Sequence, residues 1–196
     1  MGSSTRVKPV FVVTGPSGAG KGTLIDLVLP RFPELAVAVS ATTRPRRAGE
    51  RDGVHYYFLD RREFDRRVAA GDFLEWVDYV GNRYGTLLSE VERLRAAGKA
   101  PLLELETEGA RRVKERVEGA VTIFVTAPLA ELERRLRERA TESSGEIGGR
   151  IATARRQLAE RDAFDYVVRN DDRERAAEAL AAILGRELAA ASMAAR

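Results

Sequence analysis

A glycine-rich segment between two apolar stretches constrains the fold of this chain more than any other feature. Residues 7–14 are nearly all apolar and β-branched, which predicts a buried strand, and residues 21–29 carry apolar side chains at helical spacing. Backbone N–H groups of a glycine loop, together with the start of a helix, bind phosphate. We therefore predict a strand, a phosphate-binding loop and a helix, with the phosphate contacts made by Gly15, Pro16, Ser17, Gly18, Ala19, Gly20, Lys21, Gly22 and Thr23.

The lysine at the end of this loop argues against a plain connection that binds nothing. The chain has 33 basic residues and only four are lysines, yet Lys21 stands where a compact ammonium would reach the β and γ phosphates of a nucleotide. The strict motif has Ser or Thr next, whereas this chain has Gly22, so Thr23, Ser17 or a water would supply any hydroxyl near magnesium. The loop ending is also similar to that of adenylate kinases. By itself the loop indicates a phosphotransferase or an NTPase.

Most of the remaining chain alternates between strand and helix patterns. Strands are predicted at 35–39, 101–106, 121–126 and 166–168, and helices at 87–97, 109–117, 129–139, 150–161 and 174–191. This alternation predicts an α/β fold with a parallel sheet that helices cover on both faces.

Two segments interrupt the alternation. Residues 40–86 are polar, aromatic and rich in glycine, with short strands predicted at 54–59 and 73–79 and a helix at 62–70. Residues 141–149 are small and polar and predict a mobile stretch. We expect a core at 7–39 and 87–195, an inserted small mixed α/β lobe at 40–86, and a short lid at 138–152.

Composition limits the classes of site and partner. The chain has no cysteine and one histidine, which excludes disulfides, thiol catalysis and multi-histidine metal sites, so any metal is held by oxygen, as magnesium prefers. The net charge of +3 is too small to indicate a nucleic-acid-binding protein. No apolar run approaches the roughly 18 residues of a membrane span. We expect a cytoplasmic protein with no membrane, nucleic-acid or obligate protein partner.

Three motifs after the loop resemble those of the guanylate kinase family. They are Ser40 to Phe58, which reads SATTRPRRAGERDGVHYYF, then Phe73-Leu74-Glu75-Trp76, and then Gly81-Asn82-Arg83-Tyr84-Gly85-Thr86. Together with the loop and Asn170-Asp171, the resemblance covers about residues 7–172. It implies a P-loop kinase core whose inserted lobe binds GMP. It also implies magnesium-assisted transfer of a phosphoryl group from ATP to GMP, and to dGMP, in purine nucleotide salvage and supply.

The resemblance assigns roles to several basic and aromatic residues. Arg44 and Arg47, with Tyr56 and Tyr84, would grip the phosphate of GMP, because two guanidinium groups neutralise a dianion and phenols add neutral donors. Asn170 would contact the adenine of ATP. The lid arginines that would bind the transferring phosphate or the ATP phosphates are Arg135, Arg139 and Arg150.

Guanine and adenine present opposite hydrogen-bonding patterns, which suggests how the base is chosen. Guanine offers donors at N1 and N2 and an acceptor at O6, so Glu75 would accept while Ser40 or Thr86 donates. A carboxylate that faces adenine would lose its partner, and this loss favours GMP over AMP by about 100-fold or more. The alternative interpretation of Glu75 is a surface carboxylate on an edge strand.

The segment Leu103-Glu104-Leu105-Glu106 alternates at the end of a predicted strand, which would place both carboxylates on one face near the loop. The resemblance implies that Glu104 lies near magnesium and that Glu106 recognises the guanine amino group. The family usually has Asp at position 106 and Gln at position 108, whereas this chain has Glu106 and Glu108.

Two other functions compete with GMP phosphorylation. One is a guanylate-kinase-like interaction module without turnover, which would be expected to lack the glycine loop or its lysine. The other is a P-loop kinase for a different small acceptor, which the combination of Glu75, Arg44 and Arg47 disfavours.

Overall fold

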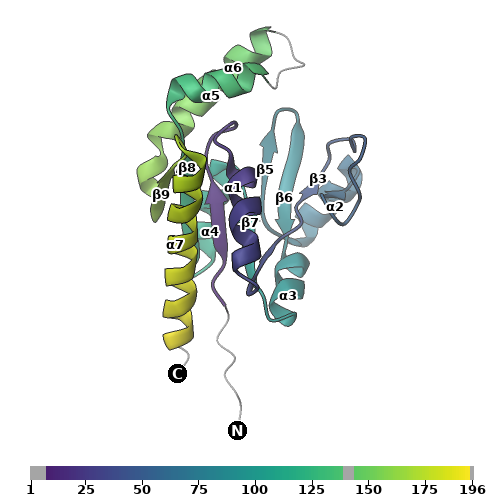
Figure 1. Cartoon of the computed structure of the whole chain (residues 1–196). Coiled ribbons are helices and arrows are strands. Elements are labelled where there is room, and N and C mark those ends of the chain that lie inside the picture. The colour runs from purple at the N-terminus through teal and green to yellow at the C-terminus, as the bar shows by residue number, and fades with distance from the viewer. Residues whose placement is uncertain (1–7, 139–143, 195–196) are drawn as a thin grey trace.

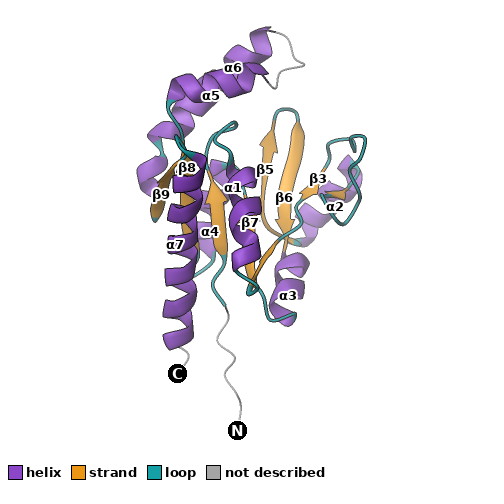
Figure 2. Cartoon of the chain, viewed as in Figure 1, coloured by secondary structure: helices purple, strands orange, loops and turns teal. Residues whose placement is uncertain are grey.

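The computed structural model describes residues 8–138 and 144–194 and contains two β-sheets (Figures 1 and 2). The helices are α1 (Lys21–Val28), α2 (Arg61–Ala70), α3 (Leu88–Ala96), α4 (Thr107–Arg116), α5 (Leu129–Glu138), α6 (Ser144–Ala159) and α7 (Arg173–Met193). The strands are β1 (Phe11–Thr14), β2 (Leu35–Val37), β3 (Ala41–Thr42), β4 (Tyr57–Phe58), β5 (Phe73–Tyr79), β6 (Asn82–Leu87), β7 (Ala100–Glu104), β8 (Val121–Thr126) and β9 (Tyr166–Arg169).

The large sheet has five parallel strands in the order β2-β7-β1-β8-β9. Strand β1 lies in the centre, and its burial on both faces explains why all four residues are apolar or hydroxyl-bearing and buried. The loop after β1 therefore emerges at the middle of the carboxyl edge, where ligands bind in open parallel sheets. The predicted parallel α/β core is confirmed.

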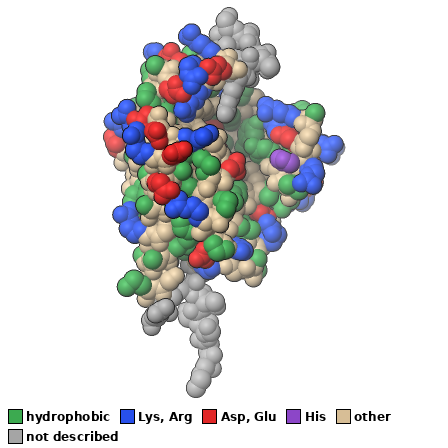
Figure 3. Space-filling view, viewed as in Figure 1, with side chains coloured by type: hydrophobic (Ala, Val, Ile, Leu, Met, Phe, Trp, Pro, Cys, Tyr) green, Lys and Arg blue, Asp and Glu red, His purple; other side chains and the backbone are tan. Residues whose placement is uncertain are grey.

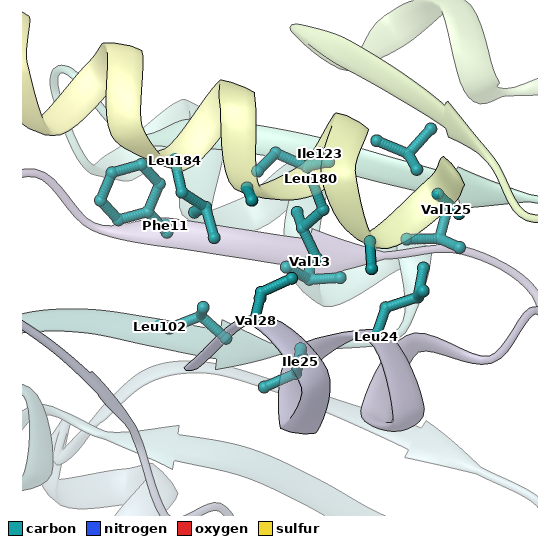
Figure 4. Close-up of a cluster of buried hydrophobic side chains, with 14 of the residues drawn as sticks. Phe11, Val13, Leu24, Ile25, Val28, Leu102, Ile123, Val125, Leu180 and Leu184 are labelled. Atoms are coloured by element: carbon teal, nitrogen blue, oxygen red, sulfur yellow. The ribbon is translucent and has the colours of Figure 1, made fainter. Parts of the chain in front are cut away.

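Side chains of successive residues in β1 supply two separate hydrophobic cores. Phe11 and Val13 point into a cluster with α1 and α7, which includes Leu24 and Leu184 (Figure 4). Val12 points to the opposite face and packs with side chains of α3 and α4. This alternation follows from the strand period of two, and it holds helices firmly on both faces of the sheet.

The small sheet has the order β4-β3-β6-β5, with antiparallel β5 and β6 joined by a tight turn at Val80 and Gly81. The register shifts between Phe73 and Glu75, so Glu75 lies opposite Thr86. A bulge of this kind re-aims a side chain. Helix α2 covers the sheet, and its N-cap residue is Asp60, whose side chain accepts from the Glu63 N–H at 2.8 Å.

The structure corrects three local predictions. Strand β7 ends at Glu104, so Glu106 is not on the strand but is the N-cap residue of α4. The predicted mobile stretch at 141–149 is helical from Ser144, where α6 begins, while 141–143 lie outside the described residues. Strands β3 and β6 were not predicted, because their sequences are short or mix glycine with polar residues.

None of the helices in the described residues has both the length and the apolar character needed to cross a membrane.

Candidate active site

A cavity of about 640 Å³ lies between the phosphate loop, the end of β7 and the small sheet. Figure 3 shows Lys and Arg side chains on the small-sheet part of the molecule, beside this region. The cavity has two ends, which we name after their predicted roles: the phosphate end at the loop and the base end around Glu75. The predicted site residues that line it are Ser17, Gly18, Gly20, Lys21, Gly22, Thr23, Ser40, Arg47, Tyr56, Glu75, Tyr84, Glu104 and Glu106.

At the phosphate end, the loop conformation depends on residues without side chains. Gly15 has φ 135°, and a Cβ there would overlap the carbonyl oxygen of Val125. Gly20 has φ 86°, and a Cβ there would lie 2.5 Å from Asn170 Nδ2. Lys21 is 8% exposed, and its Nζ donates to the carbonyl oxygens of Gly15 at 2.7 Å and Pro16 at 3.4 Å. The ammonium is thus held within the loop before any phosphate arrives.

At the base end, Glu75 is almost completely buried, with 2% of the residue exposed. Its Oε2 lies 2.5 Å from where a Cβ on Gly109 would be, so the first turn of α4 leaves room for the carboxylate only because position 109 is glycine. Glu75 Oε1 and Thr86 Oγ1 are both buried and have no hydrogen-bond partner. Buried polar atoms are normally paired, and Glu75 lines the cavity, so its unpaired oxygen points to a ligand. Thr86 does not line the cavity, but its side chain lies near enough to Glu75 to lower the pKa of that carboxyl.

The ionisation of Glu75 reflects the same burial. Burial raises the pKa of Glu75 to about 7, while the neighbouring Thr86 and the positive charges of Arg112 and Arg116 oppose the rise. A carboxylate in this state is poised to ionise when donors reach it. Guanine N1–H and N2–H are donors of that kind.

The predicted phosphate-gripping residues adopt two different arrangements. Arg47 lines the cavity with Tyr56 and Tyr84, whose rings meet edge to face at 6.1 Å. Arg44 is not part of the wall: both its terminal nitrogens donate to Glu50, at 3.1 and 2.7 Å, and its guanidinium lies 5.4 Å from the Tyr56 ring centre. Glu50 also accepts from the Arg47 N–H at 2.7 Å. These contacts lower the pKa of Glu50 to about 2.

Two acids form the floor between the phosphate end and the base end. The carboxylate of Glu104 packs over the loop, since Oε2 lies 3.4 Å from where a Cβ on Gly22 would be. Glu104 is exposed to the cavity, and desolvation by the surrounding walls raises its pKa, which Lys21 opposes and Glu106 raises further. Glu106 accepts from Gln157 Nε2 at 3.1 Å. A cation near these carboxylates would be favoured electrostatically.

Residues predicted to bind ATP gather at a second, smaller cavity of about 230 Å³ on the other side of the loop. It is lined in part by Arg135 and Asn170, and Asn170 Nδ2 donates to the Ala19 carbonyl at 2.7 Å while its buried Oδ1 has no partner. Arg135 Nη1 donates to the Gly18 carbonyl at 3.1 Å. Arg150 Nη2 donates to Ser17 Oγ at 3.0 Å. Arg139 lies outside the described residues.

Comparison with known proteins decides the family. A sequence model described as guanylate kinase matches residues 7–187. The chain belongs to the guanylate kinase family. It is 50% identical over 181 residues to the guanylate kinase of Rubrobacter xylanophilus, covering 92% of this chain and 95% of that one. It is 46% identical over 185 residues to the guanylate kinase of a Synechocystis species, covering 93% and 97%.

A solved structure agrees with this placement in the guanylate kinase family. The crystal structure of guanylate kinase from Anaplasma phagocytophilum superimposes with a TM-score of 0.74 at 31% identity, over 93% of this chain and 87% of that one. The predicted P-loop kinase fold is therefore confirmed.

Three residues that contact the predicted site residues escaped the sequence prediction. They are Glu50, which binds Arg44, Gly109, which makes room for Glu75, and Gln157, which binds Glu106. Glu50 has a sequence signal, since it is a lone acid just after the basic run 44–47. Gly109 and Gln157 lie far in sequence from their partners, and only the fold brings them together.

Proposed function

We propose that this chain catalyses the transfer of the γ-phosphoryl group of ATP to GMP, giving ADP and GDP, with the roles of individual residues set out below. One observation carries the proposal. A single cavity holds the Lys21 loop at one end and the unpaired carboxylate oxygen of Glu75 at the other. A nucleoside monophosphate bound there would have its base at Glu75 and its phosphate toward the loop.

Glu75 and Thr86 select guanine. The ionised carboxylate accepts from N1–H and N2–H, and the Thr86 hydroxyl donates to O6, which pairs both orphan atoms at once. Adenine has an acceptor at N1 and a donor at its amino group, so it would leave the carboxylate facing an acceptor. A buried unpaired charged group costs more than about 1 to 3 kcal/mol, which corresponds to a preference for GMP of about 100-fold.

Arg47, Tyr56 and Tyr84 hold the phosphate of GMP, and Arg44 supports them from its pair with Glu50. The residues 40–86 act as the GMP-binding lobe. Arginine suits this task because its planar fork matches phosphate oxygens.

The ATP phosphates lie in the loop, where Lys21 and the backbone N–H groups of residues 15–23 neutralise them. Arg150 and Arg135, which already contact Ser17 and Gly18, add positive charge at the transferring phosphoryl group. We further assign Arg139 to this set from its place in the sequence, and Asn170 Oδ1 to the adenine amino group.

Magnesium fits the acids of this site. No group of three or more His, Asp or Glu side chains in the described residues is placed to hold a metal. Magnesium usually keeps several waters and binds mainly to substrate phosphates. Glu104 and the hydroxyl of Thr23 would hold it, partly through water. When bound, the ion would neutralise charge that develops on the β and γ phosphates.

The phosphoryl transfer consists of one step, in which one bond forms and one bond breaks. An oxygen of the GMP phosphate forms a bond to the γ phosphorus as the bond from that phosphorus to the β–γ bridging oxygen breaks, and the electron pair stays on ADP. The attacking oxygen is already ionised, so no general base is needed. Catalysis rests on alignment and charge neutralisation by Lys21 and the arginines.

A coupled assay with MgATP and each of GMP, dGMP, AMP, CMP and UMP tests the proposal. We expect ADP formation with GMP and dGMP at rates far above those with the other acceptors. Folded protein that gives no GDP would refute it and favour the non-enzymatic interaction module. Equal rates with AMP would refute the role of Glu75.

A further inference from the structure

One face of helix α6 carries two polar side chains that contact two different sites. Arg150 donates to Ser17 of the phosphate loop, and Gln157 donates to Glu106 at the floor of the base end. A spacing of seven residues is almost two helical turns, so both side chains lie on one face, about 10 Å apart along the axis. Ala154 lies between them on that face and is 1% exposed. Helix α6 therefore contacts both the phosphate loop and Glu106.

Helix α6 is anchored independently of these two contacts. Arg155, on a different face, donates to Glu133 of α5 at 3.1 Å, and Figure 1 shows α5 and α6 running together beyond the edge of the large sheet. Residues 150–157 belong to one continuous helix, which moves as one body, so a change at Arg150 is transmitted to Gln157.

Gln157 is the only glutamine of the sequence, and it is buried, with 8% of the residue exposed. It lines a cavity of about 660 Å³ that adjoins the GMP cavity, and Glu106 lines both. Although Glu106 is the N-cap residue of α4, its side chain makes no capping hydrogen bond. The Gln157 amide is the donor that fixes this carboxylate.

The amide suits this task better than a charged side chain would. A lysine or arginine at 157 would neutralise Glu106 and compete with the guanine amino group, and a carboxylate would repel it. A glutamate at 106 also has one more rotatable bond than the aspartate usual in the family, so it loses more side-chain entropy when it is held in place. A neutral donor holds one oxygen and leaves the charge for the ligand.

We propose that Gln157 is a positioning residue that orients Glu106 toward the guanine amino group and, through α6, couples ATP binding to GMP binding. The inference rests on the proposed function, because it takes Glu106 as a guanine contact.

Calorimetric titration of GMP, with and without a saturating non-hydrolysable ATP analogue and magnesium, tests the coupling. Gln157→Met keeps the length of the side chain and removes the donor. We expect it to lower GMP affinity by about tenfold, as for one hydrogen bond to a charged group. The affinity for the ATP analogue in the absence of GMP should be unchanged. GMP should then bind equally tightly with and without the analogue. Arg155→Ala, which removes an exposed ion pair and touches neither Ser17 nor Glu106, should keep the coupling of the unaltered chain.

Gln157→Glu provides a second variant if the first does not fold, and it should lower GMP affinity further, because two carboxylates would then face each other. Equal losses for GMP and the ATP analogue, or coupling that survives in either folded variant, would overturn the proposal. GDP formation by the unaltered chain is measured in the same preparation. If GDP forms and Gln157→Met behaves like the unaltered chain, only the role of Gln157 fails, whereas absence of GDP refutes the proposed function itself.

Discussion

The two ends of the active cavity differ in how well their polar groups are paired before substrate binds. At the phosphate end, Lys21 donates to the carbonyl oxygens of Gly15 and Pro16. At the base end, Glu75 Oε1 and Thr86 Oγ1 are buried without partners. The first arrangement holds the ammonium in place, and the second destabilises the folded chain unless a ligand pairs these atoms.

This difference separates the two tasks of the enzyme. A phosphate chain is common to all nucleotides, so the loop needs only positive charge and fixed geometry. Base selection needs a penalty for the wrong ligand, and atoms left unpaired in a dry pocket provide it. Variants at the two ends should therefore fail in different ways.

The largest effect is expected at the phosphate end. Lys21→Met should lower turnover by about 100- to 1000-fold, because it removes a donor aimed at the charge that develops during transfer. The thermal midpoint should change little, and circular dichroism with a coupled assay would check both. Lys99→Met is the matched control, since Lys99 Nζ also donates to a carbonyl, that of Pro33 at 2.6 Å, but on the exposed surface. Turnover within a few fold of normal in Lys21→Met would contradict the role of the lysine.

The next effect is expected at the base end. Glu75→Gln should weaken GMP binding by about 100-fold and leave the binding of an ATP analogue unchanged, because only the guanine contact is lost. Glu90→Gln is a matched control: Glu90 is also 2% exposed, but its oxygens accept from Val39, Tyr57 and Arg93. That variant should lose stability and keep GMP affinity. Comparable losses of GMP and ATP affinity in Glu75→Gln would count against a guanine contact.

The same substitution should change how stability depends on pH. The pKa of Glu75 is about 7 in the folded chain, above the ordinary 4.5, so the folded state holds an extra proton between these values. Its contribution to stability is full below pH 4.5 and is lost as pH rises to about 7, a change of ~3 kcal/mol. Urea unfolding at pH 5 and pH 8 should show this loss in the unaltered chain and not in Glu75→Gln. A similar pH dependence in both proteins would mean that Glu75 ionises normally.

The smallest effect on GMP binding is expected at the ion pair between Glu50 and Arg44. Glu50→Gln should raise the KM for GMP about fivefold, because it loosens the ion pair that holds Arg44 in place. The KM for ATP and the turnover at saturating GMP should be unchanged. A loss confined to turnover would place Arg44 at the transferring phosphoryl group instead.

The elements whose pattern is strongly apolar were predictable from sequence. The predicted strands 73–79 and 121–126 are β5 and β8, and the strand, loop and helix around Gly15 to Thr23 form as expected. Strand β6 was missed because Asn82-Arg83-Tyr84-Gly85 is polar and gains its place only by pairing with β5.

Site residues that belong to local motifs could be predicted from sequence. Contacts between side chains of the site could not. Lys21, Arg47, Tyr56 and Glu75, which local motifs indicate, all line the cavity, and their action on a ligand stays a prediction. The pairing of Arg44 with Glu50 and the space that Gly109 leaves for Glu75 depend on side-chain directions that a sequence does not record.

The pH dependence of GMP affinity tests most directly whether guanine binds the ionised carboxylate of Glu75. The dissociation constant is measured by calorimetry from pH 5.5 to 9 in the unaltered chain and in Glu75→Gln, so that titration of the GMP phosphate cancels in their ratio. We predict that the advantage of the unaltered chain is constant above about pH 8 and falls about tenfold per pH unit well below pH 7, since guanine binds the ionised carboxylate. An advantage that stays constant over the whole range would contradict the account.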